Sequence, residues 1–272
     1  MSSTFDYFQA FIIGNCIGSF LNVVIYRLQN NFSIIKPRSF CPKCKTKLSW
    51  RENIPLISYF IQRGKCIHCN NPISIKYPFI EFITGILFVI SINSSPTFFI
   101  SNYNFFSNIF FSWIFLSLLI CIALIDIESF WIPQVLINFG FISGILGLIF
   151  LGLFDDKYID FYILFKGLST SACAFFIFES LRYLAKYFFK KDAIGKGDSK
   201  LVAILALWLG PIGTLFAVSI SYIFAAIYCL VGFSINLIRP GQIIPFGPFL
   251  SLGGGFVWFL GNNFFIEKIL RI

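Results

Sequence analysis

The sequence predicts an all-α polytopic membrane protein with about eight transmembrane helices. Hydrophobic residues make up 57% of the 272 residues and charged residues only 12%, about half the charged share of a typical soluble domain. The mean hydropathy is +0.83. Apolar stretches of roughly 20 residues, the length that crosses a bilayer, recur along most of the chain. Helices are expected for these stretches because a helix satisfies its own backbone hydrogen bonds in lipid.

The expected spans follow one another with short connections. The first lacks the basic segment and the cleavage site of a signal peptide, so it is expected to remain as a helix. The sixth is short and is separated from the seventh by the sequence LGPIG, a Gly/Pro break that suits a tight turn at a membrane face. The spans cover residues 8–26, 78–93, 105–125, 132–153, 161–185, 199–211, 213–237 and 246–265.

One soluble insert, residues 29–77, separates the first helix (1–28) from the remaining transmembrane part (78–272). Ten of the 21 Lys and Arg residues fall between Arg27 and Lys76, where Glu52 is the single acid. Such an excess of positive charge places a loop of a membrane protein on the cytoplasmic side. We therefore attribute the net charge of +9 to membrane topology and expect no nucleic-acid partner.

The positions of the remaining loops follow from this orientation. The N-terminus and the segments 93–97 and 154–160, uncharged and acidic respectively, are expected on the outer side. The loops 126–132, 186–200 and 239–245 are expected on the cytoplasmic side, and two of these three are visibly basic.

The insert contains two CxxC pairs, which predict a structural zinc site. Their four thiolates would surround one ion tetrahedrally, as zinc prefers, and 21 residues separate the pairs. In a reducing cytoplasm, metal binding is a better interpretation than disulfides. The insert is too small for a substantial core and needs such a staple. The four ligands are Cys41, Cys44, Cys66 and Cys69. We expect His68 to be a solvated surface residue, and Cys16, Cys121, Cys173 and Cys229, which lie in apolar runs, to be small hydrophobic residues of the core.

Two carboxylates are expected at the same membrane face. Asp126 ends the third span and Asp198 begins the sixth. Singly, Asp198 could be a helix N-cap and Asp126 a charge at the water boundary. Together, two carboxylates that share one proton can activate a water molecule for attack on an amide. Gly195 and Gly197 would then allow a substrate backbone to approach Asp198 closely.

A phosphate-binding loop is a competing interpretation of GKGD at residues 195–198. It fails because the spacing GxxxxGK[ST] is absent and because a carboxylate at that helix start would repel phosphate.

Several segments, in this order, resemble signatures of the bacterial type IV prepilin peptidases, membrane aspartyl proteases with a GxGD motif. They cover nearly the whole chain and include the two CxxC pairs. The others are GSFLNVVIYRL (Gly18–Leu28), ENIPLISYFIQRGKC (Glu52–Cys66), YPFIE (Tyr77–Glu81), ALIDIESFWIP (Ala123–Pro133), GKGDSKLVA (Gly195–Ala203) and IPFGPFLSLGG (Ile244–Gly254).

The resemblance implies that the protein cleaves the basic leader from type IV prepilins and type II secretion pseudopilins, after a glycine, at the cytoplasmic face of the bacterial inner membrane. Asp126 and Asp198 would be the catalytic pair of a peptidase domain over 78–272. The zinc-binding cysteines are typical of members that also methylate the new N-terminal residue, usually phenylalanine, with S-adenosylmethionine. The insert 29–77 would be associated with this second activity.

The resemblance leaves two points open. Gln134 stands where the family commonly has Asp or Asn, which is expected to alter local polar contacts and to leave proteolysis intact. The residues that bind the methyl donor are not fixed by the motifs. Asn22, Arg27 and Glu81 are polar groups near span ends that would suit this role, and a purely structural role suits them equally.

A multi-pass transporter that uses Asp126 and Asp198 as ion-coupling sites is the alternative, with the zinc insert as a brace. A transporter is expected to show an internal repeat or helices interrupted at the middle of the membrane. Neither is evident, and both carboxylates are expected at a membrane face. A non-catalytic assembly scaffold is a third possibility, in which neither aspartate would matter.

Overall fold

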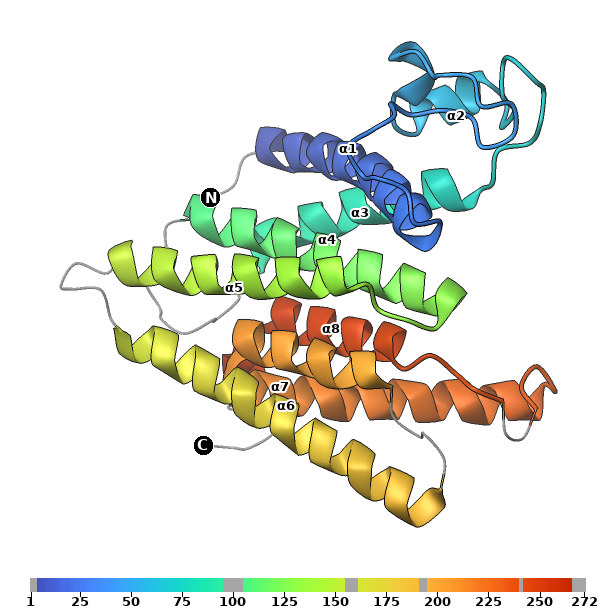
Figure 1. Cartoon of the computed structure of the whole chain (residues 1–272). Helices are drawn as coiled ribbons and strands as arrows, with labels where there is room; N and C mark the ends of the chain where they lie inside the picture. Colours follow the sequence, from blue (N-terminus) through green and yellow to red (C-terminus); the bar gives the residue numbers. More distant parts are fainter. Residues whose placement is uncertain (1–3, 95–104, 155–160, 191–194, 240–241, 266–272) are drawn as a thin grey trace. The chain divides into compact units, whose positions relative to one another are not determined.

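The computed structural model describes residues 4–94, 105–154, 161–190, 195–239 and 242–265 (Figure 1). The chain divides into two compact units, Met1–Asn93 and Ser94–Ile272. The described residues form helices and two isolated β-bridges, which confirms the all-α class. Positions 95–97 and 155–160, within two loops that we assigned to the outer side, lie outside the described residues.

Unit 1 is built on two long helices, α1 (Thr4–Gln29) and α3 (Lys76–Asn93), which pack on each other. Glycines of α1 permit this approach. A Cβ atom at Gly14 would lie 2.7 Å from the Gly85 Cα atom, and one at Gly18 would lie 2.7 Å from the Glu81 Cα atom. Small residues spaced by four positions are typical of close helix pairs in membranes. The contact brings the polar residues at the ends of α1 and α3 together.

Between these helices lie a short 3-10 helix, η1 (Arg51–Asn53), a short helix, α2 (Ile57–Ile61), and two turns that carry the cysteines. The two turns repeat one hydrogen-bond pattern. The Cys41 N–H donates to Thr46 and the Cys66 N–H donates to Asn71, both over 2.9 Å. An isolated β-bridge closes each turn, Phe40 with Lys47 and Lys65 with Pro72. We did not expect this short local repeat from the sequence.

The described residues of unit 2 form five helices. The first segment of α7 is its centre, since every residue from Leu201 to Leu209 is at most 3% exposed. A helix that is apolar on all sides is typically enclosed by others, and α7 packs against α5, α6 and α8. The helices are α4 (Phe105–Ser129), α5 (Gln134–Phe154), α6 (Phe161–Phe189), α7 (Lys196–Ser234) and α8 (Gly247–Phe265).

Helix α7 is two segments separated at Gly210. This residue has φ 69° and ψ −177°, which is not helical, and Pro211 follows it. The φ value lies in the region that glycine adopts without strain. The two segments run back along each other in Figure 1, and Tyr222 of the second lies near Asp198 of the first. The break that we expected at LGPIG is therefore present.

An aromatic cluster fixes the middle of unit 2. The ring of Trp208 stacks on Phe115 with centroids 4.9 Å apart, and Phe115 also contacts Trp258 at 4.7 Å. The Trp208 indole N–H donates to the Gly140 carbonyl over 3.0 Å, and the Trp258 indole N–H donates to the Ser112 hydroxyl over 3.0 Å. Both buried indoles thus have hydrogen-bond partners, as buried tryptophan requires.

Five of the described helices are long and apolar enough to cross a membrane, α1, α3, α4, α6 and α7, and residues 134–150 and 247–261 form shorter apolar helices. The chain is therefore a multi-pass membrane protein. The number of eight spans and the domain boundaries at residues 28 and 77 stay predictions.

Candidate functional site

The two predicted carboxylates meet in unit 2. Asp126 lies in the last turn of α4, and Asp198 lies in the first turn of α7. Their exposed fractions are 5% and 8%, and they are close enough to interact electrostatically. Buried charges at membrane depth are costly and are typically functional. The fold thus joins two acids that are far apart in sequence.

A main-chain N–H holds one oxygen of each carboxylate. The Gly247 N–H donates to Asp126 Oδ2 over 3.0 Å, and the Gly195 N–H donates to Asp198 Oδ2 over 3.1 Å. Within the described ranges, the second oxygen of each aspartate accepts no hydrogen bond from the protein. Each side chain is therefore anchored and still has an oxygen for a water molecule or a substrate.

Asp198 is not the N-cap of α7, so this interpretation was wrong by three residues. Gly195 is the N-cap, with φ −68° and ψ 144°. Asp198 is the third helical residue, and it accepts the N–H of the N-cap residue as acids at this position commonly do. A helix start at Lys196 allows this bond.

The two glycines beside Asp198 have an internal packing role. A Cβ atom at Gly195 would lie 3.0 Å from Asp198 Oδ2, and one at Gly197 would lie 3.1 Å from the Ile132 side chain. Their predicted role in making room for a substrate backbone stays a prediction. At Gly247, a Cβ atom would lie 2.6 Å from Asp126 Oδ2, so glycine is required for this approach. The role of Gly247 was not predicted from the sequence, although a glycine followed by a proline is a usable signal for a helix start.

A second polar group supports the start of α7. The Ser199 hydroxyl donates to Glu179 Oε2 over 3.0 Å, and Ser199 is completely buried. Arg182 forms an ion pair with Glu179 on the same helix, α6. Glu179 and Arg182 were not predicted as site residues, although charged residues inside an expected span are a usable signal.

Gln134, where the family commonly has Asp or Asn, makes two polar contacts. Its amide oxygen accepts a hydrogen bond from Lys200 Nζ over 2.6 Å, and its amide nitrogen donates to Asn138 over 2.9 Å. Lys200, in the second turn of α7, is thereby linked to the first residue of α5.

The four cysteines of unit 1 converge as predicted. Their sulfur atoms all lie within 4.8 Å of one another, and the Cys41 and Cys69 sulfurs are 3.9 Å apart. Zinc–sulfur bonds of about 2.3 Å place tetrahedral ligands about 3.8 Å apart, so the cluster fits zinc. Hydrogen bonds from Thr46 lower the pKa of Cys44 to about 6, and hydrogen bonds from Asn71 lower the pKa of Cys69. Burial and hydrogen bonding with Cys69 and Cys41 raise the pKa of Cys66 to about 11. The surroundings therefore favour the thiolate that a metal requires at Cys44 and Cys69.

His68 is exposed, as expected, but it has a partner. Its Nε2 atom lies 2.9 Å from Glu52 Oε1. The Ser49 N–H donates to the other Glu52 oxygen over 2.7 Å, and hydrogen bonding with Ser49 together with His68 lowers the pKa of Glu52. This pair connects the second cysteine turn to η1.

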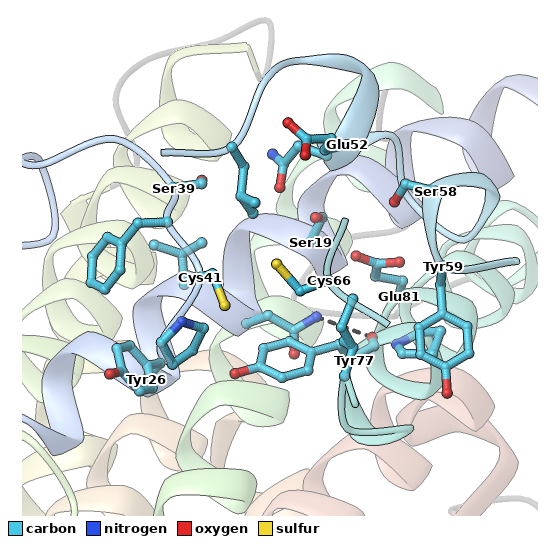
Figure 2. A pocket seen from close by; sticks show the side chains of 18 of the residues that line it. Ser19, Tyr26, Ser39, Cys41, Glu52, Ser58, Tyr59, Cys66, Tyr77 and Glu81 are labelled. Atoms are coloured by element: carbon cyan, nitrogen blue, oxygen red, sulfur yellow. Dashed lines mark hydrogen bonds between the residues drawn. The ribbon is translucent and has the colours of Figure 1, made fainter. Parts of the chain in front are cut away.

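A cavity of about 170 Å³ lies in unit 1 between the ends of α1 and α3 and the cysteine turns (Figure 2). All three residues that we considered for the methyl donor line it, Asn22, Arg27 and Glu81. Cys41 and Cys66 also line it, so the proposed metal site forms part of its wall.

Two of these three residues donate hydrogen bonds to main-chain carbonyls. The Arg27 guanidinium donates to the carbonyls of Ser33, Ile34 and Pro37. The Asn22 amide donates to the Tyr77 carbonyl over 3.1 Å. These bonds indicate structural roles for Arg27 and Asn22.

Comparison with known proteins agrees with this arrangement. Residues 12–94 match the bacterial peptidase A24 N-terminal domain, and residues 113–230 match the type IV leader peptidase family. The first match falls in unit 1 and contains the four cysteines. The second contains both aspartates. No solved structure matches the chain significantly.

Individual relatives extend over most of the chain. A prepilin leader peptidase/N-methyltransferase of Legionella pneumophila is 30% identical over 95% of this chain and 93% of its own length. A type 4 prepilin-like proteins leader peptide-processing enzyme of Escherichia coli is 31% identical over 92% of this chain and 96% of its own length. A prepilin leader peptidase/N-methyltransferase of Myxococcus xanthus is 35% identical over 73% of this chain and 55% of its own length. The chain belongs to the type IV leader peptidase family.

Proposed function

We propose that this protein removes the leader peptide from type IV prepilins and type II secretion pseudopilins and then methylates the new N-terminal amine. The observation that carries the proposal is the anchored pair Asp126 and Asp198, buried together at the ends of two helices. The family match over both units supports it.

The geometry suits hydrolysis by water. Two carboxylates that share a site hold one proton between them, because like charges at short range are not both ionised. The ionised aspartate takes a proton from the water molecule while the water oxygen bonds to the scissile carbonyl carbon. The protonated aspartate donates to the substrate, and the C–N bond breaks with a proton delivered to the leaving amine. Since Gly195 and Gly247 each fix one carboxylate oxygen, the two reactive oxygens are already oriented.

The second activity is assigned to unit 1. S-adenosylmethionine supplies the methyl group when it is bound. A zinc ion held by Cys41, Cys44, Cys66 and Cys69 has a structural role, because four thiolates leave no open coordination position. The basic insert and both aspartates are proposed to lie on the cytoplasmic side of the bacterial inner membrane.

The test is cleavage of a purified prepilin with a Gly–Phe junction by the full chain in detergent. We expect Asp126→Asn and Asp198→Asn each to lower the cleavage rate by about 100- to 10,000-fold, the range that general acid–base catalysis contributes. Glu128→Gln is the matched control. Glu128 is an exposed acid two residues from Asp126 on the same helix, and its variant should cleave at the parental rate.

The proposal fails if both asparagine variants cleave as fast as the parent. The transporter would be supported instead if the parent cleaves no prepilin, and if it transports ions in reconstituted vesicles while the two asparagine variants do not.

A further inference from the structure

Glu81 is the buried carboxylate of the cavity lining, and it has no lysine, arginine or histidine partner among the described residues. Its exposed fraction is 8%. Glu52, the other acid of the lining, pairs with His68. Arg27, the cation of the lining, donates to loop carbonyls. A buried carboxylate without a compensating charge is costly, so a cationic ligand at this position would be bound favourably.

A strained turn holds Glu81 in place. The Leu56 N–H donates to Glu81 Oε2 over 2.8 Å, and the Ser19 hydroxyl also hydrogen-bonds the carboxylate. Leu56 has φ 59° and ψ −53°, and the Ile57 N–H donates to the Pro55 carbonyl over 2.6 Å. This is a γ-turn of the rare, strained form. Such strain persists where the surroundings enforce it and is concentrated at ligand sites.

The remaining lining suits a small cation with a planar group. Tyr26, Tyr59 and Tyr77 contribute aromatic rings to the cavity (Figure 2). Aromatic faces attract cations and stack on flat heterocycles. A mainly apolar cavity with a few convergent polar groups is typical of a small-molecule site.

We infer that this cavity binds S-adenosylmethionine with its sulfonium beside Glu81. The inference rests on the proposed N-methylation. In the transfer, an N–C bond forms to the substrate amine, the methyl C–S bond breaks with its electrons left on sulfur, and the amine proton passes to water. The sulfur thereby loses its positive charge. Glu81 consequently holds the donor more strongly than the neutral by-product, which favours release after each transfer.

Measurement of ligand binding tests the position of the sulfonium beside Glu81 and does not depend on catalysis. S-adenosylmethionine and S-adenosylhomocysteine differ by one methyl group and the charge on sulfur. Calorimetry with the full chain in lipid nanodiscs should show roughly tenfold tighter binding of the methionine form, as expected for a buried charge contact. In Glu81→Gln the two ligands should bind within about twofold of each other.

Glu52→Gln is the comparison, since it removes the other carboxylate of the lining. It should keep the preference, because Glu52 is less buried than Glu81 and already has His68 as a partner. Zinc content and prepilin cleavage of Glu81→Gln, measured on the same preparation, establish that it is folded. Equal binding of both ligands by the parent overturns the inference and requires no variant. A full preference in Glu81→Gln overturns it as well.

Methyl transfer to a synthetic peptide that already begins with phenylalanine separates this inference from the proposed function. If the parent methylates the peptide and shows no sulfonium preference, the location at Glu81 is wrong and N-methylation stands. If the parent transfers no methyl group, the methylation part of the proposed function is wrong. The preference for S-adenosylmethionine over S-adenosylhomocysteine then decides by itself whether the cavity is a binding site.

Discussion

The contact between Gly247 and Asp126 explains how a buried acid is held in a fixed orientation. The first residue of α8 reaches the last turn of α4, and its N–H donates to Asp126 Oδ2. A hydrogen bond from an N–H to a carboxylate is stronger than one between neutral groups. The orientation of Asp126 therefore depends on a residue 121 positions away in the sequence.

Replacement of Gly247 by alanine tests this orientation. The new Cβ atom would lie 2.6 Å from Asp126 Oδ2, so the carboxylate has to rotate or withdraw. A displacement of about 1 Å at a reacting group can cost on the order of 100-fold in rate, and we expect a loss of that size in prepilin cleavage. Gly255→Ala is the control on the same helix, since its Cβ atom would meet Leu119 at an ordinary 3.9 Å. Equal rates for the two alanine variants would contradict the positioning role.

At the scale of single residues, the groups proposed to carry the chemistry could be predicted from the sequence, whereas the residues that hold them in place could not. Asp126, Asp198 and the four cysteines were identifiable because a carboxylate in a span or a pair of CxxC motifs is unusual by itself. Gly247 and Ser199 are ordinary residues in sequence. Their roles arise only when α8 reaches Asp126 and α6 reaches Ser199. The Gly-Pro step at 247–248 indicates a helix start, but it does not indicate which residue that start contacts.

At the scale of elements, the first segment of α7 determines where Asp198 lies. Its residues from 201 to 209 are buried on all sides, so the segment can shift only with its neighbours. Two side-chain hydrogen bonds, one buried and one partly buried, connect it to α6. Ser199 donates to Glu179 over 3.0 Å at the aspartate end, and Ser171 donates to the Ala203 carbonyl over 2.7 Å one turn further along α7.

These two bonds allow a matched comparison. Ser199→Ala and Ser171→Ala each remove one interhelical hydrogen bond, and each should lower the free energy of unfolding by about 0.6 kcal/mol, the average for such bonds in membrane proteins. Only Ser199→Ala should also lower the turnover number for prepilin cleavage, because Ser199 adjoins Asp198. Thermal unfolding and initial cleavage rates measure the two effects. Similar turnover in both variants would show that Ser199 contributes to stability alone.

The positions of the helices followed from hydropathy, and their ends did not. The expected loop at 126–132 is shorter in the structure because α4 continues to Ser129. Asp126 is consequently a helical residue. Hydropathy falls where polar residues begin, whereas a helix continues as long as its backbone hydrogen bonds are made. The same reason moves the start of α7 from the expected residue 199 to Lys196.

At the scale of the whole molecule, the two proposed activities lie in two units that each have their own packing. Unit 1 holds the cysteine cluster and the cavity, and unit 2 holds both aspartates and the tryptophan cluster. Sequence motifs indicated this separation of residues. They did not show that Asn22, Arg27 and Glu81 share one cavity, because that depends on the close approach of α1 and α3 at Gly14 and Gly18.

Removal of the metal should separate the two activities. Cys41 and Cys66 are part of the cavity wall, so loss of zinc from the cluster should deform the methyl-donor site while unit 2 keeps its core. For the double replacement of Cys41 and Cys44 by serine, we expect methyl transfer to fall about 10- to 100-fold, on the order of the effects known for perturbed metal sites. Cleavage should stay within about threefold of the parental rate, because independent sites affect each other by only about 0.5 kcal/mol.

Mass spectrometry of the processed pilin measures both steps in one reaction, because it distinguishes the precursor, the cleaved product and the methylated product. Cys173→Ser, which replaces an exposed thiol on α6, controls for the loss of a cysteine and should retain both activities. If cleavage and methylation fall together in the double variant, the cluster stabilises the whole protein and has no particular link to methylation. If zinc is lost and methylation persists, the donor site lies outside the cavity that these cysteines line.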